Sequence, residues 1–231
     1  MSTITRRRLL VGGAGLALAA AGCDGSRPRE GFLGWMERVN ERWQRALFDP
    51  DRLAPELPAA ATTPDAHFPA YRISADVPAA PAGWALRIGG LVARPLVLSL
   101  GELRRLPRTE YRIRHHCVEG WSAVASWTGV SLRELAALAG ADPRAAYVEF
   151  RSFDEGYWSS WDRESALHPQ TILAYGRNGV PLPPDYGAPL RLYAAVKLGY
   201  KMVKYVTEVN FLPVRTGGYW EDQGYEWYAG V

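Results

Sequence analysis

Cysteine and histidine are scarce in this sequence. The 231 residues include two cysteines, Cys23 and Cys117, and four histidines. Small disulfide-dense folds are therefore excluded, because they need several cysteine pairs. The two cysteines lie far apart in the chain, which also excludes the Cys-x-x-Cys-His motif that attaches a c-type haem. Each cysteine must consequently be interpreted from the residues around it.

The sequence also lacks a charge imbalance. Its formal net charge of +3 is accounted for by three adjacent arginines, Arg6 to Arg8, so the rest of the chain is neutral. Nucleic-acid binding needs a basic surface, and a neutral chain offers no electrostatic case for it. The hydrophobic content of 48% is sufficient for the core of one domain. The pattern contains neither an internal repeat nor heptads.

Long apolar runs are absent except for one near the N-terminus. Residues 9–21 carry no charge, but a helix that crosses a bilayer needs roughly 20 apolar residues. The run follows Arg6, Arg7 and Arg8, which is the arrangement of a secretory signal. The segment 5–10 resembles a twin-arginine export signal, a route that carries proteins across the membrane already folded. A membrane anchor or a buried helix is the alternative interpretation.

The end of this run resembles a lipoprotein cleavage box. It reads Ala-Ala-Gly-Cys over residues 20–23, and Cys23 would be lipidated after cleavage. Ala20 stands where such boxes usually have leucine, so cleavage with and without a lipid both stay open. We predict a signal over residues 1–23, export to the periplasm, and a protein that is either free or held at the membrane surface through Cys23.

The rest of the chain is expected to form a helix, an arm and one domain. Residues 24–64 contain helical spacing over 30–48, followed by an extended arm rich in proline and alanine over 49–64. The helix is expected to turn an apolar stripe toward the core. The stripe consists of Phe32, Trp35, Met36, Val39, Trp43 and Leu47. Residues 65–231 form the predicted domain.

Short strands outnumber helices in that domain. Capping boxes at Ser99 and Ser131 each predict the start of a helix, the second one ending near Gly140. A further helical turn is expected within residues 162–173. Strands are predicted at residues 85–88, 91–92, 95–98, 109–117, 146–150, 190–194 and 204–212. This mixture indicates a strand-rich α+β domain.

The residues around Cys117 carry the clearest chemical signal. On a strand, His115 and Cys117 point to one face and His116 to the other. This alternation argues against a His-His-Cys zinc site. A lone thiolate suits a metal whose other ligands come from a soft, sulfur-bearing cofactor. Arg112, Arg114 and His115 are expected to favour the thiolate electrostatically.

Several motifs in order resemble the sulfite-oxidase-like molybdopterin-dependent oxidoreductases. The nearest branch is similar to the catalytic subunit of the periplasmic methionine-sulfoxide reductase, and the resemblance covers roughly residues 62–231. It implies a sulfite-oxidase-type molybdopterin-binding fold and a molybdenum ion held by Cys117 and a single molybdopterin. The matching segments are residues 84–90, 117–122, 127–130, 178–184, 187–192 and 199–204.

The resemblance also implies a set of cofactor-binding residues. Cys117 is the expected metal ligand and catalytic residue, and Arg191 is expected to meet the pterin phosphate. Asp65 departs from the asparagine of the reductase branch, and Tyr186 stands where the family has asparagine or histidine. The complete expected cofactor-binding set is Asp65, His67, Phe68, Ser152, Tyr186, Arg191, Met202, Val203 and Lys204.

The remaining histidines and tryptophans receive more ordinary interpretations. His115 and His116 are expected to pack beside the site, and His168, which precedes Pro169, to belong to a local turn. Trp121 and Trp158 are the candidates for a pocket wall. No further domain follows the aromatic C-terminal segment, so we expect a monomer. Electrons are expected to come from or go to a separate redox protein, such as a membrane haem protein or a cytochrome.

Four functions stay open on the sequence. The first is oxo-transfer to or from a small molecule, with reduction of an S- or N-oxide such as methionine sulfoxide favoured by the branch resemblance. Sulfite oxidation is the second, and it would need several arginines around the metal, of which Arg112 and Arg114 are the nearest in sequence. The third is a hydrolase with Cys117 as nucleophile and a histidine such as His168 as base. The fourth is a binding module without a cofactor.

Overall fold

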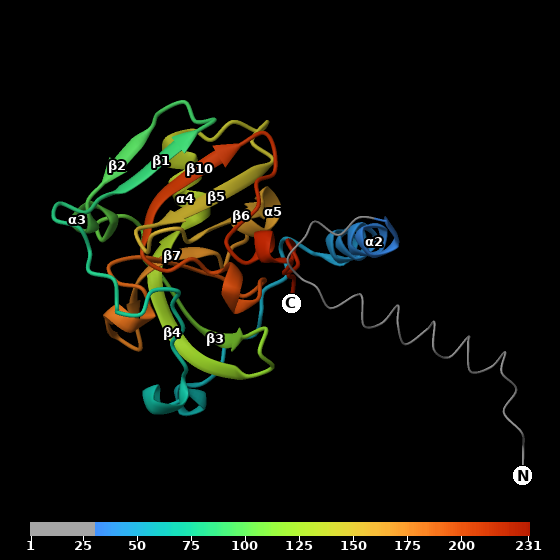
Figure 1. Cartoon of the computed structure of the whole chain (residues 1–231). Coiled ribbons are helices and arrows are strands. Elements are labelled where there is room, and N and C mark those ends of the chain that lie inside the picture. The colour runs from blue at the N-terminus through green and yellow to red at the C-terminus, as the bar shows by residue number, and fades with distance from the viewer. Residues whose placement is uncertain (1–30) are drawn as a thin grey trace, which may run out of the picture.

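The computed structural model describes residues 31–231 (Figure 1). The predicted signal over residues 1–23 and the lipidation site at Cys23 lie outside these residues. None of the helices in the described part has the length and apolarity needed to cross a bilayer. The helices are α2 (Gly31–Leu47), α3 (Leu100–Leu103), α4 (Leu132–Ala139) and α5 (Arg163–Ala166).

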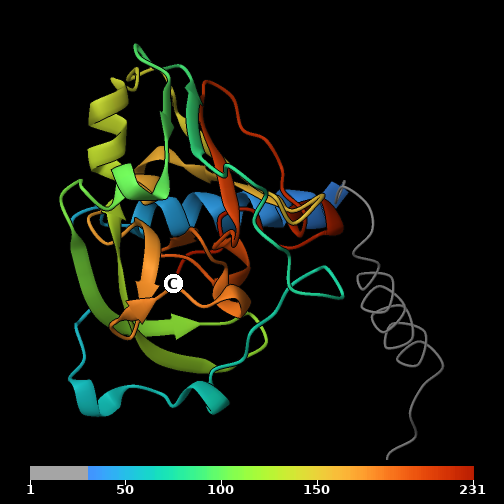
Figure 2. The same ribbon diagram turned by 90° about the vertical axis from the view of Figure 1, so that its left-hand side faces the viewer.

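Two five-stranded sheets form most of the domain. The first lies in the upper half of the molecule and the second in the lower half (Figures 1 and 2). The first has the order β2 (Leu96–Leu98), β1 (Leu86–Gly90), β10 (Val206–Leu212), β5 (Tyr147–Ser152) and β6 (Trp158–Asp162). The second has the order β3 (Thr109–His116), β4 (Ser122–Ser131), β7 (Ile172–Arg177) and β8 (Val180–Pro181), with β9 (Arg191–Tyr193) also paired to β7.

Most strand pairs are antiparallel, and one is not. Strand β1 runs parallel to β10, which lies more than a hundred residues later in the chain. A parallel pair requires a crossover connection, and here the whole second sheet and helix α4 lie within that connection. The arrangement confirms the predicted strand-rich α+β fold.

The two predicted capping boxes behave differently. At Ser99 the hydroxyl accepts from the Glu102 amide, and the Glu102 carboxylate accepts from the Ser99 amide at 2.8 Å, so the predicted box is confirmed. At Ser131 the helix α4 begins as predicted, but the serine side chain makes no capping hydrogen bond. That box is therefore wrong. Ser131 also ends strand β4 and pairs with Ile172, so tertiary pairing sets its backbone.

The arm over residues 49–64 wraps the second sheet as predicted. The Leu57 amide donates to the Arg112 carbonyl at 2.8 Å, and the Thr63 amide donates to the Val124 carbonyl at 2.9 Å. Earlier in the arm, the side chain of Gln170 exchanges two hydrogen bonds with the backbone of Ala54. These bonds satisfy backbone polar groups of a segment that belongs to neither sheet. They also fix the position of residue 63, shortly before the chain reaches Phe68.

Helix α2 confirms the predicted helix but not its predicted orientation. Gly34 is the only residue of α2 that is buried. The polar side of the helix faces the C-terminal segment, where Gln44 donates to Glu226. The apolar stripe points outward, and its exposed members are Phe32, Trp35, Met36, Trp43 and Leu47. Hydrophobic spacing identifies the apolar side of a helix but does not say what that side meets.

The core between the sheets carries a stack of aromatic rings that leads to the site. Trp127 on β4 and Tyr193 on β9 are fully buried, and their rings stack with centroids 4.0 Å apart. The ring of His115 on β3 also stacks with Tyr193, with centroids 5.9 Å apart. Packing of this kind holds the strand ends rigidly, so the side chains that follow β3 have a fixed position.

Candidate active site

A pocket opens where three parts of the chain come together: the end of β3, residues 68–73 that follow the arm, and the C-terminal segment around residues 220–225. It encloses about 1000 Å³ of space between atoms, including space open to solvent. Its polar and charged lining residues include Arg72, His115, Cys117, Glu119, Asp154, Arg191 and Lys204. Its aromatic lining residues are Phe68, Tyr71, Trp121, Tyr157, Tyr186, Tyr200, Tyr205, Trp220 and Tyr225.

Cys117 reaches this pocket from a tight turn at the end of β3. The turn is closed by a hydrogen bond from the Cys117 amide to the Trp121 carbonyl at 3.0 Å. Gly120 has a φ of 87°, a conformation that glycine adopts without strain. His115 and Cys117 both line the pocket, as the strand alternation predicts, and His116 does not.

The free thiol of Cys117 is kept protonated by its surroundings. Its Sγ lies 3.6 Å from a carboxylate oxygen of Glu119, which also accepts from the Trp121 indole at 2.9 Å. Burial raises the pKa of Cys117, and the negative charge of Glu119 raises it further. The expectation that nearby basic residues favour the thiolate is therefore wrong for the free protein, because burial and Glu119 outweigh them.

His115 is a neutral, buried wall of the site. Burial lowers its pKa to about 3, with a further contribution from the positive charge of Arg191. Its Nδ1 atom is buried and has no hydrogen-bond partner among the described residues. A Cβ at Gly199 would lie 2.5 Å from the His115 Nε2 atom, so only glycine allows the backbone to approach the ring this closely.

Two cations face the pocket without a carboxylate partner. Arg191 is 4% exposed, and its guanidinium donates to the carbonyls of Tyr186 and Met202. Lys204 donates to backbone carbonyls, including that of Asp185 at 2.7 Å. No carboxylate oxygen in the described part of the chain lies within 4 Å of either cation.

Their pKa values show the cost of this arrangement. Burial and, to a smaller extent, the neighbouring charge of Arg191 lower the pKa of Lys204 to about 7. Burial likewise lowers the pKa of Arg191 to about 10. Positive charges that are buried side by side are stabilised when an anion is placed between or beside them. This part of the pocket is therefore suited to a phosphate group.

Six of the ten residues predicted for the site line the pocket. They are Phe68, Cys117, Tyr186, Arg191, Met202 and Lys204. The other four, Asp65, His67, Ser152 and Val203, do not. Asp65 instead accepts from Arg177 at 2.6 Å. The Ser152 hydroxyl accepts from the amide of Asp154 at 2.8 Å, and it is Asp154 that lines the pocket.

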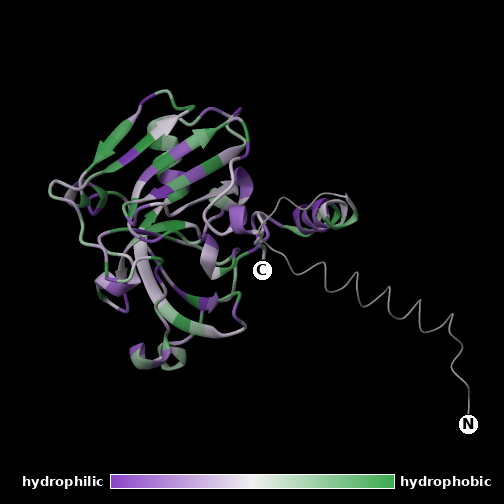
Figure 3. Ribbon diagram, viewed as in Figure 1, coloured by the Kyte–Doolittle hydropathy of each residue, from purple (hydrophilic) through white to green (hydrophobic). Residues whose placement is uncertain are grey.

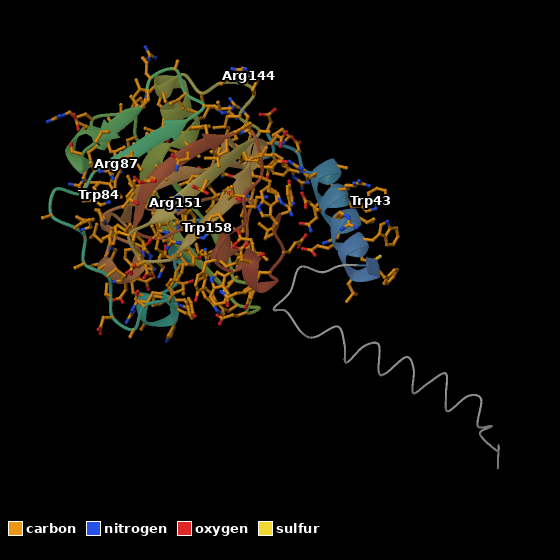
Figure 4. The ribbon with its side chains drawn as sticks, turned by 45° about the horizontal axis from the view of Figure 1, so that its top comes forward. Trp43, Trp84, Arg87, Arg144, Arg151 and Trp158 are labelled. Carbon is orange, nitrogen blue, oxygen red and sulfur yellow. The ribbon has the colours of Figure 1, made fainter. Side chains whose placement is uncertain are left out.

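Of the other three expectations for this region, one needs correction. Trp158 is not a pocket wall: it lies on the first sheet beside Arg151, whose guanidinium is 5.8 Å from the indole ring (Figure 4). His168 does belong to a local turn, because its Nδ1 accepts from the Gln170 amide at 3.1 Å, and its Nε2 also contacts the Arg52 carbonyl of the arm. The predicted wall residue Trp121 does line the pocket.

Sequence reasoning missed much of the aromatic wall. Tyr200, Trp220 and Tyr225 form part of it, and Trp220 packs on Tyr225 with ring centroids 5.0 Å apart. The density of aromatic residues after Gly217 was a signal for these residues. The signal for Arg72 and Asp154 was weaker, because single charged residues in a loop have no distinctive spacing.

Comparison with known proteins gives the class of this protein. Residues 74–220 match the model of the oxidoreductase molybdopterin binding domain. The chain therefore belongs to the family of oxidoreductases with a molybdopterin-binding domain. Its fold is similar to that of the sulfane dehydrogenase SoxCD from Paracoccus pantotrophus, with a TM-score of 0.54 and 26% identity over 57% of this chain and 38% of that one.

Two curated relatives are more similar in sequence. The chain is 40% identical, over 97% of its length and 86% of the relative's, to the "Putative protein-methionine-sulfoxide reductase subunit YedZ1" of Azospira oryzae. It is 38% identical to the protein-methionine-sulfoxide reductase catalytic subunit MsrP of Xanthomonas axonopodis pv. citri, over 60% of this chain. The chain spans about half the length of that second relative, with 48% covered.

The residues of the pocket fit a molybdopterin. No group of three or more histidine, cysteine or acidic residues in the described chain could hold a metal by itself, so a metal held by Cys117 would need further ligands from a cofactor. Arg191 and Lys204 supply the positive charge that a phosphate requires. Three buried polar atoms that line the pocket have no partner within residues 31–231: His115 Nδ1, Tyr205 Oη and Arg72 Nε. A large polar ligand would satisfy such atoms.

Proposed function

We propose that this oxidoreductase is a molybdenum–molybdopterin enzyme that reduces an S- or N-oxide, such as methionine sulfoxide. One observation carries the proposal: a single thiol, Cys117, and an unneutralised pair of cations, Arg191 and Lys204, line the same pocket. The thiol suits a soft metal, and the cations suit the phosphate of a pterin. The names of the relatives point to sulfoxide reduction.

Each part of the pocket has a task in this reaction. Cys117 would hold molybdenum and Arg191 with Lys204 the pterin phosphate, and a cofactor held in this way would supply the two-electron, oxo-transfer chemistry. Reduction of a sulfoxide also consumes two protons and releases water. Glu119 is placed to hold a proton at its carboxylate, because this group lies 3.6 Å from the Cys117 sulfur.

The walls of the pocket suit a neutral sulfoxide better than sulfite. Sulfite is a dianion and would need converging arginines. Arg112 and Arg114 do not line the pocket, and Arg114 instead donates to Ser122 at 3.2 Å. Tyr157, Tyr200 and Trp220 offer aromatic surfaces, which attract the sulfur of a thioether.

The alternative hypothesis, that Cys117 is the nucleophile of a hydrolase, has less support than oxo-transfer. Such a nucleophile needs a low pKa and a histidine base, whereas burial raises the pKa of Cys117 and its hydrogen bond goes to Glu119. His168 does not line the pocket. A binding module without a cofactor would have no use for the thiol and the two buried cations together.

The proposal includes the setting of the enzyme. The twin arginines Arg6 and Arg7 support export of the folded, cofactor-loaded protein to the periplasm, and the segment ending at Cys23 supports a lipid anchor as the alternative to a free protein. The chain has no cysteine pair for haem attachment. Electrons therefore come from a separate redox partner, a membrane haem protein or a cytochrome, and the enzyme acts as a monomer.

The test compares the two cysteines of the chain in a host that makes molybdopterin. Molybdenum, pterin and methionine-sulfoxide reductase activity with a reduced viologen dye are measured for the natural protein, Cys117→Ser and the matched control Cys23→Ser. We expect molybdenum and pterin in the natural protein and the control. Cys117→Ser should keep pterin, because Arg191 and Lys204 remain, but lose activity by about a hundredfold or more.

Three results would count against the proposal. Absence of molybdenum and pterin from the natural protein would remove its basis. Equal activity of Cys117→Ser and Cys23→Ser would exclude Cys117 as the metal ligand. Oxidation of sulfite with a ferricyanide acceptor, without any sulfoxide reduction, would keep the cofactor but reverse the assignment of substrate.

A further inference from the structure

The outward face of helix α2 is an apolar surface that the active site does not use. Five of its side chains are exposed: Phe32 by 71%, Trp35 by 51%, Met36 by 44%, Trp43 by 64% and Leu47 by 79%. Trp43 lies on the side of α2 that is turned away from the domain (Figure 4). Exposed aromatic and aliphatic residues that gather on one helix face mark a binding surface.

Polar bonds along the edge of the stripe and from the side opposite to it fasten α2 to the domain. Asn40 donates to Glu226 at 2.9 Å, and the Gly230 amide donates to Gln44 at 3.1 Å. Glu41 accepts from Arg215 at 2.7 Å. On a helix with 3.6 residues per turn, Glu41 lies roughly opposite the stripe that contains Trp43, and Gln44 lies at the edge of that stripe. The helix is thus held in an orientation that presents its apolar stripe to the outside (Figure 3).

We propose that this stripe binds the interfacial layer of a phospholipid bilayer. A helix that lies in a membrane surface combines a large apolar face of tryptophan, phenylalanine and leucine with a polar face. Helix α2 has this composition, and its polar face is already occupied by the domain. Arg38 and Arg42 are exposed beside Trp35, where long basic side chains can reach lipid phosphates.

The chain that precedes α2 supports a bilayer as the occupant. The apolar run over residues 9–21 is followed by Cys23, which lies eight residues before Gly31. Seven residues between Cys23 and Gly31 span at most about 25 Å when fully extended. Any lipid attached to Cys23 would therefore hold α2 at the membrane surface, and one lipid chain usually needs a second membrane-binding element for stable anchoring. This inference does not depend on the proposed reaction.

Binding in this way would also place the active site near the membrane. Glu226, which accepts from Asn40 of α2, directly follows Tyr225, which lines the pocket. The C-terminal segment thus joins the membrane-facing helix to the wall of the site. A redox partner embedded in the same membrane would meet the protein on this side.

The experiment measures sedimentation with vesicles of phosphatidylethanolamine containing a minor fraction of phosphatidylglycerol. The full chain carries Cys23→Ser throughout, so that a lipid on Cys23 does not contribute. Trp35→Glu/Trp43→Glu is compared with Val97→Glu/Val180→Glu, which places the same charges at valines of β2 and β8 that are exposed by 66% and 55%. The helix variant should partition into vesicles at least about tenfold more weakly than the control variant.

Folding and self-association are followed in the same samples. Circular dichroism and thermal unfolding should be alike for both variants, and Phe32→Ser/Leu47→Ser provides a second helix variant if the first is not folded. Equal vesicle binding by helix and control variants would overturn the proposal. A second result would also overturn it: the parent protein does not bind vesicles, but it forms a dimer in sedimentation equilibrium, and Trp35→Glu/Trp43→Glu dissociates this dimer. The stripe would then bind a second copy of the chain.

Discussion

Four cations in one stretch of chain, residues 191–204, fall into two pairs with different surroundings. Lys197 and Lys201 are both paired with buried carboxylates: Lys197 donates to Asp162 at 2.9 Å, and Lys201 donates to Glu221. Arg191 and Lys204 donate only to backbone carbonyls and face the pocket. The four side chains have similar chemistry, but only the second pair can neutralise a ligand.

Burial lowers the pKa of all three lysines, and the two pairs differ in what opposes this lowering. The side chain of Lys197 is 1% exposed. Burial lowers its pKa, the Asp162 carboxylate opposes this effect, and the resulting pKa is about 8. Lys204 is less deeply buried, yet its pKa falls to about 7. At Lys197 and Lys201 a facing carboxylate opposes the effect of burial, whereas at Lys204 the positive charge of Arg191 adds to it. A buried cation that has a carboxylate belongs to the structure, and one without a carboxylate marks a site for an anion.

The largest expected effect tests the paired lysines. Lys201→Met should destabilise the protein by about 3–5 kcal/mol, because it leaves the Glu221 carboxylate buried without its cation. The free energy of unfolding in urea gives the measurement. Adding Glu221→Leu to this variant should recover much of the loss. A cost below about 1 kcal/mol for the single variant would show that the pair is not a structural one.

A smaller effect is expected when the unpaired lysine is changed in the same way. Lys204→Met should leave the stability of the cofactor-free protein within about 1 kcal/mol, since no carboxylate loses its partner. It should lower cofactor affinity by about tenfold or more, because a hydrogen bond to a charged group contributes about 1.5–3 kcal/mol. Pterin content and thermal unfolding are measured beside Lys201→Met. A Lys204→Met protein that is as unstable as Lys201→Met would abolish the distinction between the two pairs.

The smallest effect sharpens the comparison through pH. The folded pKa of Lys204 is about 7 and its ordinary value is 10.5, so between these values the unfolded chain binds more protons and stability must rise with pH. The cofactor-free natural protein should lose stability relative to Lys204→Met as the pH falls from 10 to 7, and the loss should level off about one pH unit below 7. Urea unfolding across this range provides the data. A constant difference between the two proteins would mean that Lys204 keeps its ordinary pKa.

Local patterns in the sequence predicted the centre of the site well. Alternation along one strand placed His115 and Cys117 on the same face, and both line the pocket. The box at Ser99 formed because both of its partners lie within four residues. The box at Ser131 did not form, because strand pairing with Ile172 determines the backbone there.

Features that depend on distant residues were predicted poorly. Hydrophobic spacing identified helix α2 and its apolar side, but only the bonds from Gln44 and Asn40 to Glu226 show that the polar side meets the domain. The aromatic wall after Gly217 was visible as composition but not as a wall. Trp121 and Trp158 were equal candidates in the sequence, and only the first faces the pocket.

The sequence by itself determined the thiol at Cys117, the strand that presents it and the family motifs around it, because these depend on neighbours in the chain. The tertiary structure decided which of four nearby cations lack a carboxylate. Asp162 and Glu221 lie 35 and 20 residues from the lysines that they neutralise. Spacing along the chain cannot show such a pairing, because burial and charge compensation arise only when distant segments pack together.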